Sequence, residues 1–241
     1  QQEEQRDYYT LWVHQIKTLI SAMRLLLDND SDEDARLLKQ ELFKVDQYAD
    51  LALKFIKLGD IANDLVIERC DLNEIARTAV KKYSLLFVYS KLALKIEPLQ
   101  KDIPCDRMWL EFLLGQLLSN SIKYTHTGGV RIYMEQNALV VEDTGIGMSS
   151  VTVNQLFAPF FQADASTTRR FGGTGLGLAI AREDAAVHGG LLEVWSRLGE
   201  GSNFRLTLPR GDETNSFMSP VPLVPDDVTP DDGDPEVTGG W

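Results

Sequence analysis

Hydrophobic positions in the first sixty residues recur at intervals of three and four, which is the spacing of an amphipathic helix. The first series is Tyr9, Trp12, Ile16, Leu19, Met23 and Leu26, and the second is Leu38, Leu42, Val45, Ala49, Ala52 and Ile56. A polar run at 28–32 separates the two series. We therefore predict a helical hairpin, a dimerisation domain over residues 1–66. Because two helices alone bury little apolar surface, two copies are expected to form a four-helix bundle, and the protein a homodimer.

The pattern changes to mixed helices and strands from about Asp71. Asp71 is predicted to cap a helix that ends at Lys82, with Glu74 completing a capping box. Alternating apolar residues predict a strand at 92–96 and two hairpins, 130–134 with 138–142 and 191–196 with 203–208. A helix is predicted over 109–123, with the apolar face Leu110, Leu113, Leu114, Leu117 and Leu118. The expected fold class is α + α/β, with the hairpin followed by an α/β sandwich over residues 67–211.

The net charge of −12 is unevenly distributed. Residues 212–241 hold eight carboxylates, five of the nine prolines and no Lys or Arg. This acidic tail has too little apolar surface to fold, so we predict that it is disordered. The rest of the chain is near neutral, which argues against nucleic acid as a partner. Cys70 and Cys105 lack metal-ligand spacing and are predicted to be buried thiols. No stretch approaches the roughly 20 apolar residues of a spanning helix, so we expect a soluble piece.

Two glycine-rich runs suggest a phosphate ligand, Asp143-Thr144-Gly145-Ile146-Gly147 and the run Gly172–Leu178. Closely spaced glycines let a backbone approach a charged group, and the second run precedes the start of a helix, where amide groups attract phosphate. The chain has no Gly-Lys-Ser/Thr to end a Walker loop, and neither run fits Gly-x-Gly-x-x-Gly.

Polar residues that suit ATP lie near these runs. Asn120 is placed on the polar side of its helix, where its amide oxygen suits Mg²⁺ bridging the phosphates of ATP. Lys123 lies on the same side and suits phosphate oxygens, and Tyr124 offers an aromatic edge to a base or ribose. Asp143 ends an apolar strand and can accept a hydrogen bond from the adenine amino group. Each residue taken alone is also compatible with an ordinary surface or turn position.

In order and spacing, residues 120–124, 143–147, 157–161 and 173–178 resemble the N, G1, F and G2 boxes of bacterial sensor histidine kinases, members of the GHKL superfamily of ATPases. The resemblance covers residues 1 to about 210, and implies a HisKA-type hairpin, a GHKL-type ATP-binding domain and a mobile ATP lid over 158–171. It also implies that Arg169 or Arg170 approaches the phosphates. The implied ATP-site residues are Asn120, Lys123, Tyr124, Asp143, Gly145, Gly147, Phe160, Arg169, Arg170, Gly173, Thr174, Gly175, Leu176 and Gly177, with Asn120 as the Mg²⁺ ligand.

The resemblance also identifies His14 as the phosphoacceptor. On the heptad phase above, His14 lies opposite the seam, and its neutral imidazole can attack the γ-phosphate. Thr18, one helical turn later, is at the position that helps to dephosphorylate the response regulator in related kinases. Gln15 replaces the usual Asp or Glu, as in the Gram-positive envelope-stress kinases that residues 8–17 resemble. Leu19 replaces a proline that kinks the helix, which predicts a straighter helix biased toward one of the kinase and phosphatase conformations.

Gln116 stands where hydrolytic relatives carry a glutamate that activates water, so transfer is favoured over hydrolysis. The leading prediction is a two-component histidine kinase that phosphorylates His14 and passes the phosphoryl group to an aspartate of a response regulator. A hinge near residues 60–70 would let His14 meet the ATP. The expected location is cytoplasmic, as the inner portion of a membrane-anchored sensor. Two alternatives are a kinase-like regulator without phosphoryl transfer, supported by Gln15 and Leu19, and a GHKL ATPase, which Gln116 disfavours.

Overall fold

The computed structural model of the 241-residue chain describes residues 13, 16–25, 27, 33–57, 65–162 and 175–209. The chain divides into two compact units, residues 1–64 and 65–241. No helix among the described residues is long and apolar enough to cross a lipid bilayer.

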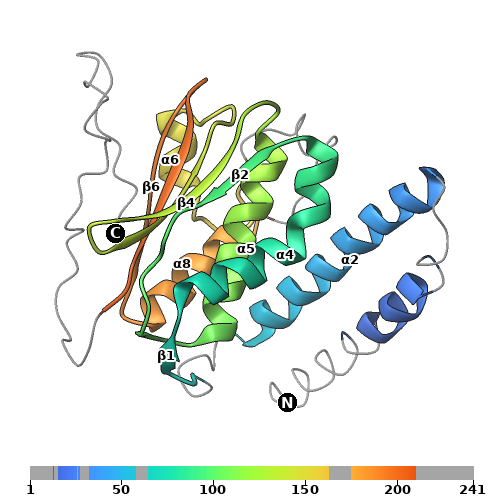
Figure 1. Ribbon diagram of the computed structural model, residues 1–241, viewed down its shortest axis with the longest axis horizontal. Helices are drawn as coiled ribbons and strands as arrows, with labels where there is room; N and C mark the ends of the chain where they lie inside the picture. Colours follow the sequence, from blue (N-terminus) through green and yellow to red (C-terminus); the bar gives the residue numbers. More distant parts are fainter. Residues whose placement is uncertain are drawn as a thin grey trace. The chain divides into compact units, whose positions relative to one another are not determined.

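The first unit is helical, as predicted. Residues 16–25 form one helix and α2 (Glu33–Lys57) forms the other (Figure 1). Asp46 links the two helices by pairing with Arg24 at 3.0 Å and with Lys17 at 3.5 Å. Lys17 also pairs with Asp50. Lys17 in the first helix thus reaches Asp50 in α2, whereas Arg24, farther along the first helix, reaches the earlier residue Asp46. The two helices therefore run antiparallel.

The packing of this hairpin divides the predicted seam between buried and exposed residues. Val13 and Ile20 are buried, whereas Leu19 and Met23, both assigned to the seam, are 61% and 47% exposed. In α2 the predicted series likewise divides between buried and exposed members. The buried members are Leu42 and Ala49, and the exposed ones are Leu38 and Val45. Each predicted series, chosen by spacings of three and four, therefore contains residues from two adjacent apolar faces. The hairpin buries one of these faces.

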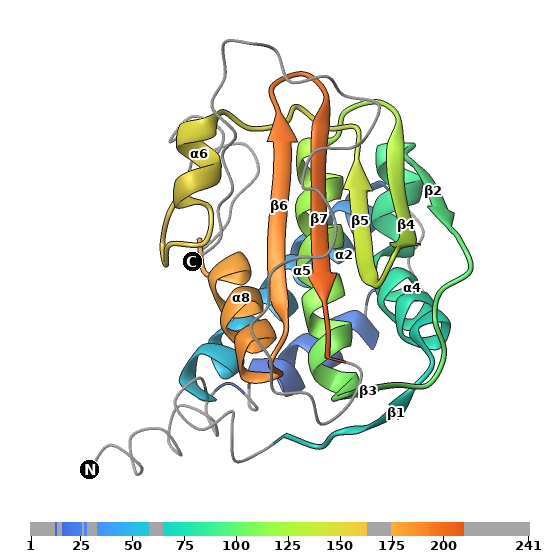
Figure 2. The ribbon, with the colours of Figure 1, turned by 90° about the vertical axis from the view of Figure 1, so that its left-hand side faces the viewer.

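The second unit contains a five-stranded sheet (Figure 2). Its strands, in spatial order, are β2 (Ala93–Ile96), β4 (Gly129–Glu135), β5 (Ala138–Asp143), β7 (Gly201–Thr207) and β6 (Leu191–Arg197). The pair β2–β4 is parallel and the others are antiparallel. Both predicted hairpins are confirmed, and they meet where β5 pairs with β7.

Helices cover one face of this sheet, as Figures 1 and 2 show. They are α4 (Leu72–Ser90), α5 (Arg107–Tyr124) and α8 (Gly177–Val187), and a short helix α6 (Ser150–Gln155) contacts β6 at the edge. Helix α5 is central, because it contacts α4, α8 and β5. The five leucines predicted for its apolar face are all buried. The predicted α/β sandwich is therefore confirmed.

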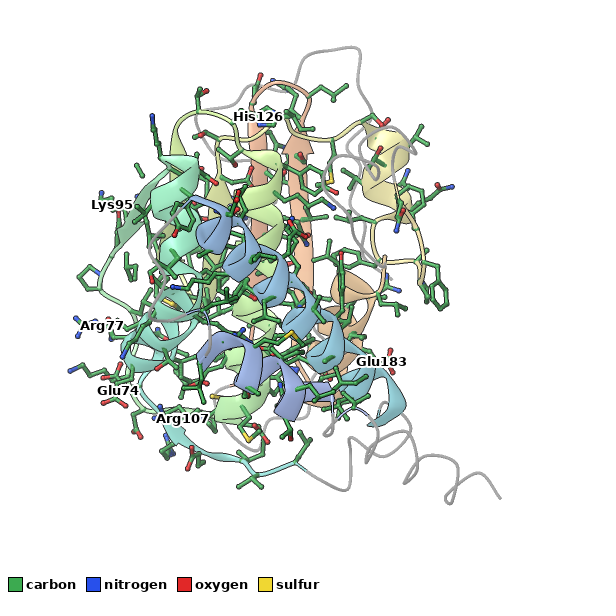
Figure 3. The ribbon with its side chains drawn as sticks, turned by 90° about the vertical axis from the view of Figure 1, so that its right-hand side faces the viewer. Glu74, Arg77, Lys95, Arg107, His126 and Glu183 are labelled. Atoms are coloured by element: carbon green, nitrogen blue, oxygen red, sulfur yellow. The ribbon has the colours of Figure 1, made fainter. Side chains whose placement is uncertain are left out.

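Helix α4 departs from the prediction at both ends. Asp71 caps it by accepting from the Asn73 amide at 2.8 Å, but Glu74 pairs with Arg107 of α5 at 3.1 Å and completes no capping box (Figure 3). The helix continues past Lys82 because Tyr83 and Phe87 are buried. It ends at Ser90, before a residue in the left-handed conformation.

A second, two-stranded sheet was not predicted, because its strands are too short to show a period. It consists of β1 (Glu68–Cys70) paired antiparallel with β3 (Ile103–Cys105). Cys70 and Cys105 lie in these strands as buried free thiols, as predicted. The Cys70 Sγ is 3.7 Å from the Cys105 carbonyl oxygen.

Candidate nucleotide site

Helix α5 presents a polar stripe opposite its buried leucines. Gln116, Asn120 and Lys123 follow one another at intervals of four and three, so they share one side of the helix, and all three are half-buried. The Lys123 ammonium lies 4.7 Å from the centre of the Tyr124 ring. This side of α5 thus offers amide oxygens and a cation next to an aromatic ring.

Asp143 ends β5 with its side chain on the helix-covered face of the sheet. Its Oδ1 accepts from the backbone amides of Gly145 at 2.9 Å and Ser202 at 3.2 Å, and its Oδ2 accepts from the Ser121 hydroxyl at 3.1 Å. The residue is only 6% exposed. Burial raises the pKa of this carboxyl above its usual value, although the three hydrogen bonds oppose the shift. The structure therefore fixes Asp143 in one orientation at the end of a strand.

The loop after Asp143 is held against the end of α5. The Ile146 amide donates to the Tyr124 carbonyl at 3.1 Å. A Cβ on Gly145 would lie 2.9 Å from the same carbonyl oxygen, and a Cβ on Gly147, where φ is +63°, would lie 1.8 Å from the Arg197 carbonyl oxygen. Both predicted glycines are thus required for close packing of this loop between α5 and the β6–β7 turn.

The segments at 157–161 and 175–177 meet through their backbones. The Phe160 amide donates to the Gly175 carbonyl at 2.9 Å, and both residues have positive φ. Gly177, the first residue of α8, lies against α5, because its Cβ would be 2.2 Å from the Gln116 Oε1. Leu176 is the N-cap of α8, and its side chain has no oxygen with which to satisfy the first amides of the helix.

The four predicted motif segments are therefore brought together around α5. Residues 143–147 touch its C-terminal end, α8 begins against its middle, and residues 157–161 pair with the glycine before α8. Thr18 is exposed on the helix at 16–25, in the first unit. The other predicted site residues lie outside the described residues, as do most of the predicted lid and the acidic tail. They are His14, Gln15, Arg169, Arg170, Gly173 and Thr174.

Sequence reasoning missed two residues that hold Asp143, Ser121 and Ser202. Both are buried, and both donate to the carboxylate. Ser121 could have been noticed, since it is a polar residue within the apolar face of α5. Ser202 gave no such signal, because only the pairing of β5 with β7 brings it to Asp143.

The described residues contain no cluster of three or more His, Cys, Asp and Glu side chains able to hold a metal ion. A divalent cation at this site would therefore need oxygens from its ligand in addition to the Asn120 amide. Such sharing is usual for Mg²⁺, which keeps waters and bridges nucleotide phosphates. The half-buried Asn120 fits this kind of shared site.

Residues 105–212 match the sequence profile of the histidine kinase-, DNA gyrase B-, and HSP90-like ATPases. The sensor histidine kinase MtrB of Mycolicibacterium paratuberculosis is 32% identical over 239 residues, covering 92% of this chain and 42% of MtrB. The sensor protein BceS of Halalkalibacterium halodurans is 28% identical, covering 88% of this chain and 64% of BceS. The chain thus spans about two fifths of the first relative and less than two thirds of the second.

Solved structures share the fold. Full-length ShkA in complex with AMPPNP superposes with a TM-score of 0.60 at 23% identity, covering 85% of this chain and 47% of ShkA. The Acinetobacter baumannii histidine kinase AdeS superposes with a TM-score of 0.58 at 20% identity, covering 83% of this chain and 98% of AdeS. At these identities the likeness concerns the fold.

Proposed function

We propose that this chain transfers the γ-phosphoryl group of ATP to His14. Two findings support the proposal: residues 105–212 match the histidine kinase-, DNA gyrase B-, and HSP90-like ATPases, and the relatives compared above are sensor histidine kinases. The observation that carries this proposal is the convergence of the four motif segments around α5. ATP uses all four, because it needs a base-reading acid from 143–147, a cation-binding amide from 120–124, a phosphate-binding helix start after 173–176, and the aromatic segment 157–161 beside them.

The roles of the binding residues follow from their positions. Asp143 accepts a hydrogen bond from the adenine amino group, next to the Gly145–Gly147 loop, which leaves room for the base. Lys123 and the first amides of α8, which follow Gly175 and Leu176, attract the phosphates. Tyr124 and the exposed Phe160 flank the nucleotide. Arg169 and Arg170 belong to the lid that closes over it, and Gly173 and Thr174 belong to the glycine-rich run that follows the lid.

Asn120 is proposed to hold Mg²⁺ together with the phosphates. The bound ion would neutralise charge on the phosphate oxygens during transfer. The rest of the metal coordination would come from the nucleotide and water, because the described residues offer no cluster of acidic or imidazole ligands beside Asn120.

The transfer step itself needs a neutral imidazole. One ring nitrogen of His14 forms a bond to the γ-phosphorus, the bond from that phosphorus to the bridging oxygen breaks, and ADP leaves.

Gln116 supports transfer rather than hydrolysis, because an amide cannot accept a proton from water as a carboxylate does. Gln15 would orient the imidazole by accepting its other N–H. A hinge near residues 60–70 would bring His14 to the ATP.

The partners proposed are a second copy of the chain and a response regulator. Leu19, Met23, Leu38 and Val45 are large apolar side chains exposed on the hairpin, which supports a dimer that buries them in a four-helix bundle. The receiver domain would take the phosphoryl group from His14 onto an aspartate, and Thr18 would contribute to its dephosphorylation. The parent protein is proposed to be a membrane-anchored sensor with this portion in the cytoplasm.

Incubation of the chain with Mg²⁺ and γ-labelled ATP tests this function. Acid-labile label is expected on the wild type, and it should be lost in His14→Ala and in Asn120→Ala. His126→Ala is the matched control, because His126 is an exposed histidine in the turn after α5 and should not change labelling (Figure 3). Nucleotide binding without label would favour a kinase-like regulator, and release of free phosphate without label would favour an ATPase.

A further inference from the structure

Helix α4 carries large apolar side chains on two of its sides. One side packs against α5 and includes the buried residues Tyr83 and Phe87. On the solvent side, Leu85 is 61% exposed, Val88 is 70% exposed and Tyr89 is 40% exposed. Spacings of three and four place these three residues next to one another on the helix surface. Single exposed apolar residues are normal in a soluble protein, whereas a contiguous group marks an interaction site.

Basic residues flank this apolar group along the chain. Residues 72–96, which cover α4 and β2, hold five Lys and Arg but only one carboxylate, although the whole chain has a net charge of −12. Arg77 and Lys81 lie eight and four residues before Leu85, so they share its side of the helix. Lys91 directly follows the last turn. We call Arg77, Lys81, Leu85, Val88, Tyr89 and Lys91 the α4 face.

The positive charge of the α4 face is available to a partner. Glu74, the one carboxylate in this stretch, pairs with Arg107 of α5 at 3.1 Å. None of the ion pairs among the described residues involves Arg77, Lys81 or Lys91. Figure 3 shows Arg77 projecting outward from the second unit. A partner of this face therefore needs apolar atoms at its centre and negative charge around them.

We propose that the α4 face docks on an anionic lipid surface. Leu85, Val88 and Tyr89 enter the boundary between headgroups and acyl chains, and the basic residues contact lipid phosphates. An amphipathic helix with Lys and Arg beside its apolar residues binds such surfaces through buried apolar area and through attraction to anionic lipids. The long stems of Lys and Arg let their charged groups stay among the headgroups while the neighbouring apolar side chains lie deeper. This contact is separate from phosphoryl transfer, and neither depends on the other.

Two other partners fit the α4 face less well. A second copy of the chain, related by a twofold axis, brings the same basic residues together, and residues 75–96 offer no carboxylate to pair with them. A protein partner is disfavoured because lysine is depleted from protein–protein interfaces. The α4 face contains Lys81 and Lys91, and Lys95 of β2, with a side chain that is 70% exposed, projects on the same side of the second unit as Arg77 (Figure 3). A lipid surface suits these flexible cations, because its headgroups can move to meet them.

Co-sedimentation of the full chain with lipid vesicles tests the proposal. The chain should bind vesicles made of equal parts of phosphatidylcholine and phosphatidylglycerol, and bind pure phosphatidylcholine several-fold more weakly. High salt should reduce the binding, because it screens the attraction between exposed charges. Val88→Asp should lower binding several-fold. Val151→Asp is the matched control, since it adds the same charge at a 67% exposed position of α6, and it should bind as the wild type does.

A fluorescent label gives a second measurement, which places no charge in the α4 face. Leu85→Cys and, as the control, Val151→Cys are labelled with an environment-sensitive fluorophore, while the native Cys70 and Cys105 are buried. Addition of the mixed vesicles should shift the emission from position 85 to shorter wavelength and leave the emission from position 151 unchanged. Equal shifts at the two positions, or no shift at position 85, would overturn the proposal.

Other results of the sedimentation experiment would also count against a lipid partner. They are absence of binding to the mixed vesicles and equal weakening by Val88→Asp and Val151→Asp. Binding to polyglutamate but not to vesicles would assign the face to an acidic protein, and dissociation of a dimer by Val88→Asp would assign it to a contact between copies. Labelling of His14 by ATP is measured separately, so a failure of the proposed kinase activity is distinguished from a failure of lipid binding.

Discussion

The Phe160 amide donates to the Gly175 carbonyl at 2.9 Å, and the two residues have positive φ angles of +63° and +69°. They flank residues 161–174, to which most of the proposed ATP lid belongs. The lid is therefore anchored at both ends by one backbone contact. That contact lies beside Gly177, where α8 begins against Gln116. A change at either end of the lid should thus be transmitted to the phosphate-binding start of α8.

Substitution of Gly175 by alanine should weaken nucleotide binding. Its Cβ would lie 2.6 Å from the Phe160 carbonyl carbon, and the left-handed conformation adds about 1 kcal/mol of strain. Gly199→Ala is the control, because Gly199 also has positive φ but an added Cβ meets nothing within 4 Å. Fluorescent ATP titration and thermal melting should show lower affinity for Gly175→Ala only, and stability losses that are larger for Gly175→Ala. Equal effects of the two substitutions would contradict the proposed anchor.

Asp143→Asn should separate stability from binding. Burial raises the pKa of the Asp143 carboxyl, so its favourable contribution to stability is present below the ordinary aspartate pKa and is lost as the pH rises through the raised value. Asparagine keeps an acceptor for the Gly145 and Ser202 amides and carries no charge. At neutral pH the variant should therefore be at least as stable as the wild type, while its affinity for ATP falls.

Denaturant unfolding across acidic to neutral pH, together with ATP titration, checks this expectation. The stability of the wild type relative to Asp143→Asn should decline as the pH rises. A variant that is clearly less stable at neutral pH would show that the ionised carboxylate stabilises the fold, and retained ATP affinity would remove Asp143 from the proposed site.

Asn120 and Asn73 should behave in opposite ways. Asn73 donates to the Leu99 carbonyl and accepts from the Leu99 amide, both at 3.0 Å, so Asn73→Ala should lower the free energy of unfolding by about 1–3 kcal/mol and leave labelling by ATP intact. Asn120→Ala should change the free energy of unfolding by no more than about 0.5 kcal/mol, because only a half-buried polar side chain is truncated. It should abolish labelling, because the proposed Mg²⁺ ligand is removed. Urea unfolding and labelling at several Mg²⁺ concentrations measure both effects. Full labelling of Asn120→Ala at low Mg²⁺ would exclude the proposed metal role.

Restoring a proline at position 19 should change the balance of activities. Leu19 is exposed on the helix at 16–25, so Leu19→Ala should be mild, whereas Leu19→Pro removes a backbone donor and costs roughly 3 kcal/mol of helix stability. The kink is expected to alter the ratio of autophosphorylation to response-regulator dephosphorylation. Both rates are measured for both variants with a receiver domain as substrate. If Leu19→Pro keeps the wild-type ratio, the straight helix does not set the balance.

The two cysteines should be unreactive in the folded protein. Burial raises the pKa of the Cys70 thiol and of the Cys105 thiol, and the thiolate is the reactive form. A thiol reagent at pH 8 should therefore modify neither residue until denaturant is added, after which both react. Rapid modification of native protein would indicate that the β1–β3 sheet opens readily.

Local patterns in the sequence were sufficient for most elements of the second unit. The leucine spacing of α5 and the alternation in the two hairpins carried enough information, because one face of each element is buried and the other is not. The prediction of a capping box at Asp71 was wrong because the local sequence could not decide which partner Glu74 contacts. Glu74 had two possible partners, and Arg107, distant in sequence, is the one that it contacts.

The sequence by itself determined which chemistry is present: glycines for close backbone approach, an acid at a strand end, and an amide and a cation on one helix side. Only the tertiary structure decided how these groups are held, because the contacts that hold them join residues far apart in the chain. The pairing of β5 with β7 supplies Ser202 to Asp143, and Gly175 meets Phe160 across the lid segment. The two apolar faces of the hairpin likewise depend on packing, which spacing along the chain does not encode.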